Sequence, residues 1–535
     1  MERVAPSALN YDNILPLAIE SRSNRREFRP NNGATFSNAT GATHIRIDVN
    51  ADSMLDPLNS YLEVSINNTS AVANNKLGLC PFGPAFIQRL RIESGGVVIE
   101  DIDEYSRLYA MTSLCQCPKE YLSKNYNAMG MYQKLATSNL RGANNDGAER
   151  RYTNDDVCGS CDTNAQVANP VSLSTELEYP PSLQSKIAGF DAGATVANAA
   201  GNQPTGSALN QHCKTSPGVG HKMCIPLLSG FLNMDKYIPL IMMNAGFTLD
   251  IELVADEKIG TATVEAAAGN SALGAALYSV SDVKYVAHLI DLDRGFYDRL
   301  RAVMEGSGGV LQLAGQTYRH YVGQIPNSVG PHTITLPARV KSVKSIFATF
   351  HDNGTYGTQA GGYSQSVFQN ALLSQFRFEI GSVRYPQNDV QCRMTGTDRA
   401  NTAGINDVIR TEQSEFLVEL QKAFGKLGDY QHQLAFDRKN LMNVDRPMTG
   451  GAAGVYGDSV ISSYVLGYDF EAFQRVALEA GINTADRSLP INFICSRYQQ
   501  LPDAAGAAQQ TRADFYVLTD AIYYINLDGT VSVSV

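Results

Sequence analysis

Leu90-Arg-Ile-Glu-Ser-Gly-Gly-Val-Val-Ile-Glu100 is the stretch around which the fold can be worked out. Two short runs of residues that favour β-strands flank Ser94-Gly95-Gly96. Because glycine alone reaches positive φ without a steric penalty, this pattern predicts a tight β-hairpin.

A similar stretch occurs far downstream. Phe376-Arg-Phe-Glu-Ile-Gly-Ser-Val-Arg-Tyr-Pro386 has the same order of an apolar-Arg-apolar-Glu strand, a glycine turn and a second strand that opens with Val. In an alignment of the two stretches, Arg91, Glu93, Gly95 and Val97 coincide with Arg377, Glu379, Gly381 and Val383. Ile525-Asn-Leu-Asp528 likewise resembles Ile290-Asp-Leu-Asp293. These repeats suggest a duplicated β-domain.

Chain length supports two domains. The 535 residues exceed the roughly 250–300 residues at which a single hydrophobic core stops growing. Gly306-Ser-Gly-Gly309 is glycine-rich and close to the midpoint, and is therefore the expected junction. The sequence predicts an N-terminal arm over residues 1–40, a first β-domain over 41–305 and a second over 310–535.

Strand patterns dominate both halves. Ile45, Ile47 and Val49 alternate with polar residues, and the run from Phe247 to Leu253 does so most clearly. Helical spacing is limited to short stripes, which are Phe296, Leu300 and Met304, then Leu417, Leu420, Phe424 and Leu427, and a less complete one at Phe470, Phe473 and Ala477. Many strands, few helices and no βαβ alternation indicate an all-β protein built from antiparallel sandwiches with long loops at their ends.

Residues 125–220 break this pattern, because they are rich in Asn, Ala, Gly, Ser and Thr. A loop region of this length is uncommon inside a compact domain. We interpret it as an insertion at one end of the first β-domain.

Composition restricts the function. The net charge of -10 provides no general basic field that would attract nucleic-acid phosphates. No apolar run approaches the ~20 residues that span a bilayer, and the N-terminus lacks the pattern of a signal peptide. We therefore expect folding in a reducing compartment, where nine scattered cysteines fit free thiols better than a disulfide framework.

The chain resembles a known family, the double jelly-roll major capsid proteins of double-stranded DNA viruses, and within it those of polinton-like viruses and virophages. The resemblance rests on the order and spacing of several segments over about 45–110 and from 225 onward, and the insertion is unmatched. These segments are Phe86–Ile102 with Tyr105, Pro226–Phe231, Tyr237–Leu240, Ser342–Phe347 and Ile380–Pro386.

The resemblance implies two tandem eight-stranded jelly rolls and a homotrimer that forms a pseudo-hexagonal capsomer of an icosahedral shell. Its implied partners are other copies of the chain, neighbouring capsomers, and penton and minor capsid proteins, without sequence-specific nucleic-acid binding. An internal membrane is left open. The protein is expected in the virion, after synthesis in the host cell cytoplasm. A closed threefold ring of chains with two similar lobes has six similar lobes, and so fits hexagonal lattice positions.

The sequence contains no recognisable catalytic motif, and we expect no enzyme activity and no cofactor. Asp101, Asp103 and Glu104 cluster after the hairpin, but acids beside a strand end are usually solvated rather than catalytic.

Zinc is the sharpest chemical alternative. Cys158 and Cys161 have the spacing that lets two thiolates share a tetrahedral zinc, and Cys213 and Cys224, with His212 and His221, could supply further ligands. One Cys-x-x-Cys without a tight second pair is a weak signal, so the sequence favours free thiols. A disulfide within the insertion is a further alternative.

Two other function classes remain open. A β-sandwich lectin or adhesin would be a stable monomer or small oligomer that binds glycans. A glycoside hydrolase would need paired carboxylates in a sugar cleft that is typically walled by aromatic residues, and the absence of tryptophan weighs mildly against it.

Overall fold

The computed structural model of this chain describes its strands and the helices beside them. The described residues are 21–72, 75–79, 83–116, 214–215, 217–218, 220–265, 271–274, 277–306, 308–352, 368–369, 371, 373–392, 415–425, 461–462, 464–472, 481–486, 489–497 and 510–535. Residues 1–20 of the expected arm and nearly all of the expected insertion lie outside these ranges.

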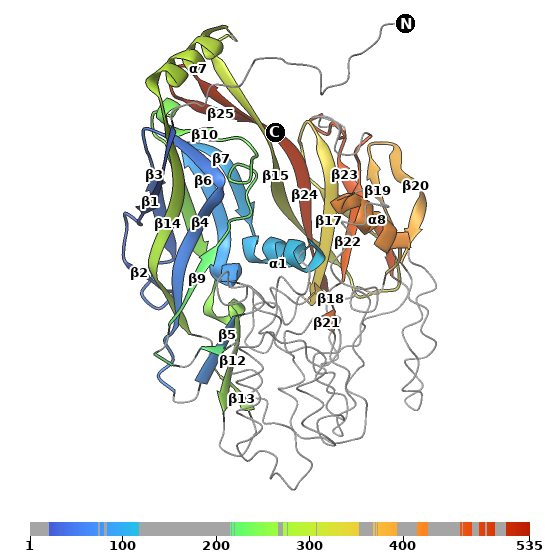
Figure 1. Cartoon of the computed structure of the whole chain (residues 1–535). Helices are drawn as coiled ribbons and strands as arrows, with labels where there is room; N and C mark the ends of the chain where they lie inside the picture. The colour runs from blue at the N-terminus through green and yellow to red at the C-terminus, as the bar shows by residue number, and fades with distance from the viewer. Residues whose placement is uncertain are drawn as a thin grey trace, which may run out of the picture.

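The first sandwich contains two antiparallel sheets (Figure 1). Its strands are β1 (Ser21–Phe28), β2 (Thr35–Phe36), β3 (His44–Val49), β4 (Met54–Asn68), β6 (Ile87–Ser94), β7 (Val97–Asp103), β9 (Gly220–Ile225), β10 (Ile238–Pro239), β11 (Phe247–Leu253) and β14 (Tyr278–Leu292). One sheet has the order β1-β14-β4-β10, with β2 beside β14 and β9 beside β4. The other has the order β3-β11-β6-β7.

The second sandwich repeats this arrangement. Its strands are β15 (Val310–Ile325), β16 (Gly330–Leu336), β17 (Val343–Asp352), β19 (Leu373–Ile380), β20 (Val383–Gln391), β22 (Val465–Asp469), β23 (Ile491–Arg497), β24 (Thr511–Asn526) and β25 (Val531–Ser534). One sheet has the order β15-β24-β17-β22 with β25 beside β24, and the other has the order β16-β23-β19-β20. The main four-strand order of each sheet in the first sandwich thus has a counterpart in the second.

The two hairpins that suggested the duplication occupy equivalent places. Gly95 and Gly96 have φ values of +56° and +84° between β6 and β7, and Gly381 has a φ of +61° between β19 and β20. An arginine on the first strand of each hairpin binds the glutamate two residues later: both Arg91–Glu93 and Arg377–Glu379 have Nε–Oε1 distances of 2.9 Å. The predicted hairpins and the all-β fold class are confirmed.

Alternating side chains fill both sandwiches. Ile45, Ile47 and Val49 of β3 are fully buried, and Leu249 and Ile251 of the neighbouring β11 pack with them in the same hydrophobic core. Burial of such a side chain contributes about 1.5–3 kcal/mol. The polar residues between them face outward, as the period of two requires.

The described part of the chain also includes smaller elements. Two small sheets are formed by β5 (Asn75–Leu79), β8 (Lys214–Thr215), β12 (Gly260–Glu265) and β13 (Ser271–Gly274), and by β18 (Phe368–Gln369) with β21 (Ile461–Ser462). The helices are α1 (Tyr105–Gln116), α7 (Arg294–Gly306) and α8 (Glu415–Phe424), with 3-10 turns at Gly83–Phe86, Leu240–Met242 and Asp256–Lys258. Among these described helices, none is long and apolar enough to cross a membrane.

The expected N-terminal arm differs from the structure over part of its length. Residues 21–28 form β1, which pairs with β14 along its whole length. By strand order β1 occupies the place that β15 holds in the second sandwich, so the first sandwich includes residues that the sequence assigns to the arm. Seven of the eight residues of β1 are exposed, so its sequence lacks the alternation of apolar and polar residues that would predict a strand.

The sequence patterns predict helices α7 and α8 but not helix α1. Helix α8 buries Leu420 and Phe424, and the Phe424 ring stacks on Phe347 at a centroid distance of 4.4 Å. Helix α7 forms where expected, but of its stripe only Met304 is fully buried. No sequence pattern predicts helix α1; it lies between the two sandwiches (Figure 1) and is buried on nearly every side, so it carries no amphipathic stripe.

Candidate functional site

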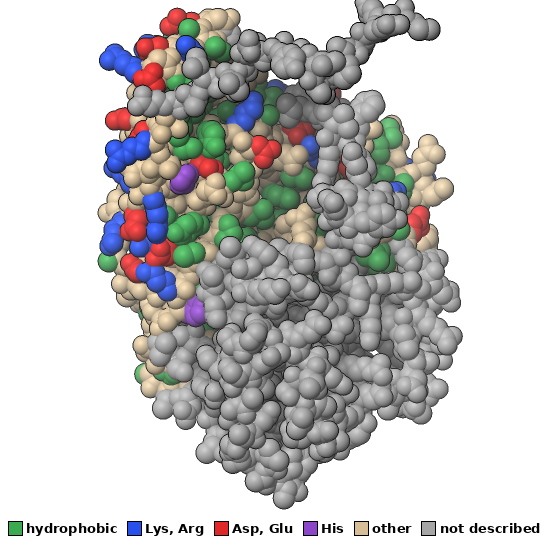
Figure 2. All heavy atoms as spheres, viewed as in Figure 1, with side chains coloured by type: hydrophobic (Ala, Val, Ile, Leu, Met, Phe, Trp, Pro, Cys, Tyr) green, Lys and Arg blue, Asp and Glu red, His purple; other side chains and the backbone are tan. Residues whose placement is uncertain are grey.

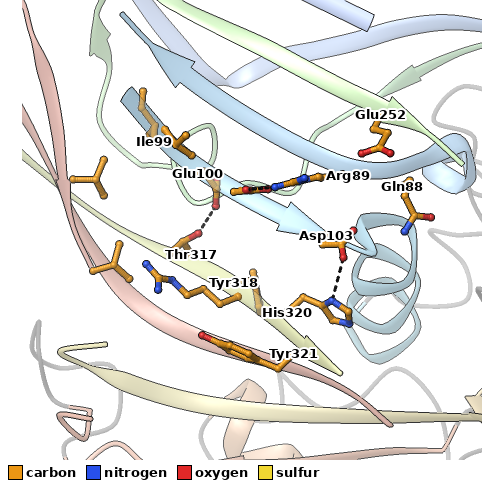
Figure 3. Close-up of a pocket in the computed structure, with 15 residues that line it drawn as sticks. Gln88, Arg89, Ile99, Glu100, Asp103, Glu252, Thr317, Tyr318, His320 and Tyr321 are labelled. Carbon is orange, nitrogen blue, oxygen red and sulfur yellow. Dashed lines mark hydrogen bonds and ion pairs between the residues drawn. The ribbon is translucent and has the colours of Figure 1, made fainter. Parts of the chain in front are cut away.

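The two sandwiches meet along β7 and α1 of the first and β15, β24 and β25 of the second. A cavity of about 910 Å³ opens at this joint, between the first hairpin and β15 (Figure 3). We call the polar side chains that cross the joint the seam. They are Glu100, Asp103, Glu104 and Arg107 from the first sandwich, and Thr317, His320, Arg512 and Asp514 from the second.

Asp514 lies at the centre of the seam. Its carboxylate has no exposed surface and pairs with the Arg107 guanidinium of α1, which is equally buried. His320 Nε2 lies 2.9 Å from Asp514 Oδ1, and Arg512 Nε donates to the same oxygen at 3.0 Å. His351 Nε2 also lies 3.8 Å from Asp514 Oδ2. A carboxylate taken out of water is stable only with such compensation, and here four basic side chains surround it.

Ionisation in the seam follows from these contacts. Burial alone would raise the pKa of Asp514, but Arg107, His320 and Arg512 outweigh it and hold that pKa well below its usual range. Burial would lower the pKa of His320, whereas its contacts with Asp103 and Asp514 raise it. The His320 ring in turn lowers the pKa of Asp103, whose Oδ2 lies 3.7 Å from His320 Nδ1. The seam therefore favours the charged form of each of these three groups.

Glu104 connects the seam to the start of α1. Its backbone has a φ of +49°, a conformation that non-glycine residues rarely adopt, and its carbonyl accepts the first helical hydrogen bonds, from Arg107 and Leu108. Two residues of β24 contact it: Arg512 Nη2 donates to Glu104 Oε1 at 2.9 Å, and the Tyr516 hydroxyl donates to its carbonyl at 3.2 Å. The second sandwich thus supports a strained turn of the first.

Glu100 forms a second polar centre at the other end of the cavity (Figure 3). Its Oε1 accepts hydrogen bonds from Thr317 Oγ1 at 2.7 Å and from the Gly230 amide at 2.9 Å, and its Oε2 accepts one from the Ser229 hydroxyl. Burial raises the pKa of Glu100, although these hydrogen bonds partly oppose the shift. One carboxyl group therefore joins β7, the 229–231 loop and β15.

Gly230 shows how closely the sandwiches approach. A Cβ atom placed on Gly230 would lie 1.4 Å from the carbonyl oxygen of Gln316 on β15. Only glycine fits between the 229–231 loop and that strand, because any side chain would have to displace backbone.

The arrangement is suited to holding two sandwiches rigidly together. The acids that the sequence raised as a weak catalytic candidate each have a basic partner: Asp101 binds Arg89 at 2.7 Å, Asp103 pairs with His320, and Glu104 binds Arg512. A basic side chain therefore holds each of these three carboxylates in place.

Most of the zinc candidates, namely Cys158, Cys161, His212 and Cys213, lie outside the described residues. Cys224 lies on β9 as a partly buried free thiol, and burial raises its pKa. His221 is three residues earlier on the same strand, so their side chains point to opposite faces. Within the described ranges, no group of three or more His, Cys, Asp and Glu residues is arranged to hold a metal.

Comparison with known proteins gives relatives by structure alone. No protein-family model and no curated protein sequence matches the chain. The Faustovirus major capsid protein is similar, with a TM-score of 0.51, 9% sequence identity, and coverage of 94% of this chain and 90% of that chain.

Two further solved structures align over nearly the whole chain. The mavirus major capsid protein has a TM-score of 0.46 and 11% sequence identity, and the alignment covers 100% of this chain and 95% of the mavirus chain. PBCV-1 VP54, fitted into a cryo-EM reconstruction of the virophage Sputnik, has a TM-score of 0.48 and 11% identity, with 98% and 99% coverage. The chain has two sandwiches with the same strand order, and its structure is similar to that of the Faustovirus protein. It therefore has the double jelly-roll fold of viral major capsid proteins.

Proposed function

We propose that this chain is the major capsid protein of a double-stranded DNA virus, and that it acts by self-assembly and without catalysis. The observation that carries the proposal is the seam, which joins two sandwiches of the same strand order into one rigid unit. A trimer of such units presents six similar lobes and can occupy the hexagonal positions of an icosahedral lattice.

The repeated fold indicates which surfaces would close the trimer. Inside the chain, β7 of the first sandwich contacts β15 of the second. Their counterparts by strand order are β20 and β1, and neither has a described strand on its outer side. Seven of eight residues of β1 are exposed, as are Val383, Arg384, Gln387 and Asn388 of β20. In the proposed trimer, β20 of one chain meets β1 of the next, so the contact between chains repeats the contact within the chain.

The charges at the edge of the first sandwich suit a protein contact. Acidic and basic side chains are interleaved on this side of the molecule (Figure 2). Lys284 of β14 pairs with Glu27 of β1 and Glu63 of β4 at 3.2 and 3.3 Å, and Lys222 of β9 lies 2.6 Å from Glu63. Mixed charges and a net charge of -10 do not favour binding to DNA phosphates. The proposed partners are therefore copies of this chain, neighbouring capsomers, and penton and minor capsid proteins of the virion.

Light scattering on the purified protein tests the proposal. We expect a species of three times the chain mass of 58.0 kDa, and pseudo-hexagonal particles in electron micrographs. Val383→Asp, in β20, should shift the protein towards monomer because it places a charge in the proposed contact. Val303→Asp is the matched control, since Val303 is an equally apolar and similarly exposed residue on α7.

Two results would contradict the proposal. A wild-type protein that stays monomeric at all concentrations would remove the capsomer, and glycan binding by that monomer would favour a β-sandwich lectin instead. An effect of Val303→Asp equal to that of Val383→Asp would reject β20 as the contact surface.

A further inference from the structure

Three charged side chains meet inside the second sandwich, away from the seam. Lys344 Nζ lies 2.7 Å from Glu471 Oε1 and 3.2 Å from Asp520 Oδ1. Lys344 is at the start of β17, Asp520 is on the adjacent β24, and Glu471 follows β22 on the other side of β17. All three side chains are at most 6% exposed.

The backbone and a neighbouring hydroxyl fix this geometry. The pairing of β17 with β24 slips by one residue between Val343 and Ser345, so Lys344 lies at a bulge. Ser342 Oγ donates to Asp520 Oδ2 at 2.7 Å, and the Asp520 amide donates to the Ser342 carbonyl at 3.3 Å. The carboxyl group is thus held from one side while the lysine amine approaches its other oxygen.

We propose that Lys344 Nζ and Asp520 Cγ form an intramolecular isopeptide bond, with Glu471 as the group that transfers the protons. The two reacting groups are in van der Waals contact, the distance at which held partners reach effective molarities of roughly 10⁵–10⁸ M. The inference does not depend on the proposed capsid function.

The reaction balances without an oxidant or a cofactor. Glu471 takes one proton from the Lys344 ammonium and delivers it to Asp520, which gives a free amine and a carboxylic acid. The amine attacks Cγ and forms the C–N bond. Glu471 then moves the second proton from nitrogen to the departing hydroxyl, the C–O bond breaks and one water leaves. Glu471 ends as it began, and can accept a hydrogen bond from the new amide N–H.

Charge accounting favours the product in this buried site. Before the reaction the cluster holds one cation and two anions, and afterwards it holds one anion, so the net charge is unchanged. A buried ion pair, which must be desolvated, is replaced by a neutral amide. The bond would tie the first residues of β17 covalently to β24, the strand that also carries Asp514 of the seam.

Peptide mapping of the folded wild-type protein tests the proposal directly. Trypsin cannot cleave after a lysine whose amine is in an amide. We therefore expect one branched peptide in which residues 342–377 and 513–535 are joined, lighter by one water than the two linear peptides together. A cyclised Asp528-Gly529 would also lose water, but it would leave 513–535 linear.

Variants test the assigned roles. Glu471→Gln should slow formation of the branched peptide by roughly 100-fold or more, which is the contribution expected of a positioned proton-transfer group. Lys344→Arg should abolish it. Lys341→Arg is the matched control and should cross-link fully, because Lys341 is exposed and donates to Ser534 Oγ, away from the cluster.

The possible results distinguish the presence of the bond from the role of Glu471. Cleavage of the wild-type chain after Lys344, with both peptides linear, overturns the proposal whatever the variants do. Full cross-linking in a Glu471→Gln protein that keeps the wild-type circular dichroism spectrum overturns the role of Glu471. All three assignments are supported by a branched peptide in the wild type and in Lys341→Arg, none in Lys344→Arg, and formation slowed by roughly 100-fold or more in Glu471→Gln.

Discussion

Arg107 on helix α1 and Asp514 on strand β24 form an ion pair without any exposed surface, although 407 residues separate them in the chain. Each belongs to a different sandwich, so the pair crosses the joint between them. Breaking a buried pair leaves an uncompensated charge, which is more damaging than the loss of a surface contact.

Arg107→Met should therefore destabilise the protein by about 3–5 kcal/mol, because Asp514 loses its main counter-charge. Urea denaturation followed by circular dichroism measures the change. Arg301→Met is the control: Arg301 forms an exposed pair with Glu305 on α7, and its loss should cost at most about 1 kcal/mol. Equal effects of the two substitutions would show that the buried pair contributes no more than a surface pair.

His320 should make the stability of the joint depend on pH. Its pKa is raised in the folded protein, so its contribution is fully present below the unfolded pKa of about 6.5 and is lost as pH rises through the folded pKa. The stability difference between wild type and His320→Gln should shrink from pH 6 towards alkaline pH. Urea titrations at a series of pH values measure this difference, and one that grows with pH would contradict the assignment.

Asp514 should act in the opposite direction. Its pKa is depressed, so its contribution is present above the unfolded pKa of about 3.8 and is lost as pH falls through the lower folded value. Wild type should therefore lose stability in acid more steeply than Asp514→Asn. Acid titrations of both proteins, followed by circular dichroism, check this; a parallel loss would show that Asp514 is not the group responsible.

Gly230→Ala tests the close approach of the sandwiches. The added Cβ would meet the Gln316 carbonyl, and relief requires a backbone shift that costs typically about 1–3 kcal/mol. The melting temperature should fall accordingly. Gly306→Ala is the control, since nothing lies within 4 Å of its Cβ position, and it should change stability by no more than about 0.5 kcal/mol. If the two melt alike, the 229–231 loop is not packed as described.

The first hairpin provides a test of backbone strain alone. At Gly96 the φ is +84° and nothing lies within 4 Å of the position that a Cβ would take, so a side chain there meets strain rather than a clash. Gly96→Val should cost about 1–3 kcal/mol, and Gly96→Asn less, because asparagine tolerates this conformation. Thermal denaturation compares the two variants. An identical loss for both would argue against strain as the cause.

Local sequence patterns predicted the elements that form locally. The glycine turn at Gly95-Gly96 and the alternation in β11 report on neighbouring residues, so the hairpin and the strand could be found without knowledge of the rest of the fold. β1 could not be found in this way. It is polar except for its last residue, Phe28, and becomes a strand because β14 pairs with it. Helix α1 is covered by both sandwiches and therefore lacks the apolar stripe that would have predicted it.

The seam could not be predicted from local sequence patterns either, because it too depends on contacts between distant parts of the chain. Its ion pairs join residues that are hundreds of positions apart, and spacing along the chain contains no trace of them. One signal is nevertheless present in the sequence. Asp514 stands between Ala513 and Phe515 and is followed by the apolar run Phe515–Leu518, and an acid in such surroundings is rarely buried unless it is paired. That signal indicates the need for a partner without identifying Arg107.

The strand order also determines when each part can form during synthesis on the ribosome. In both halves the opening strand pairs with a late one, β1 with β14 and β15 with β24, so neither half can close until its later strand has been translated. The N-terminal half can therefore fold while the other is still being made. Arg107 cannot pair with Asp514 until β24 has been translated. The N-terminal half therefore folds first, and the chain can assemble with other copies only after the two halves have joined.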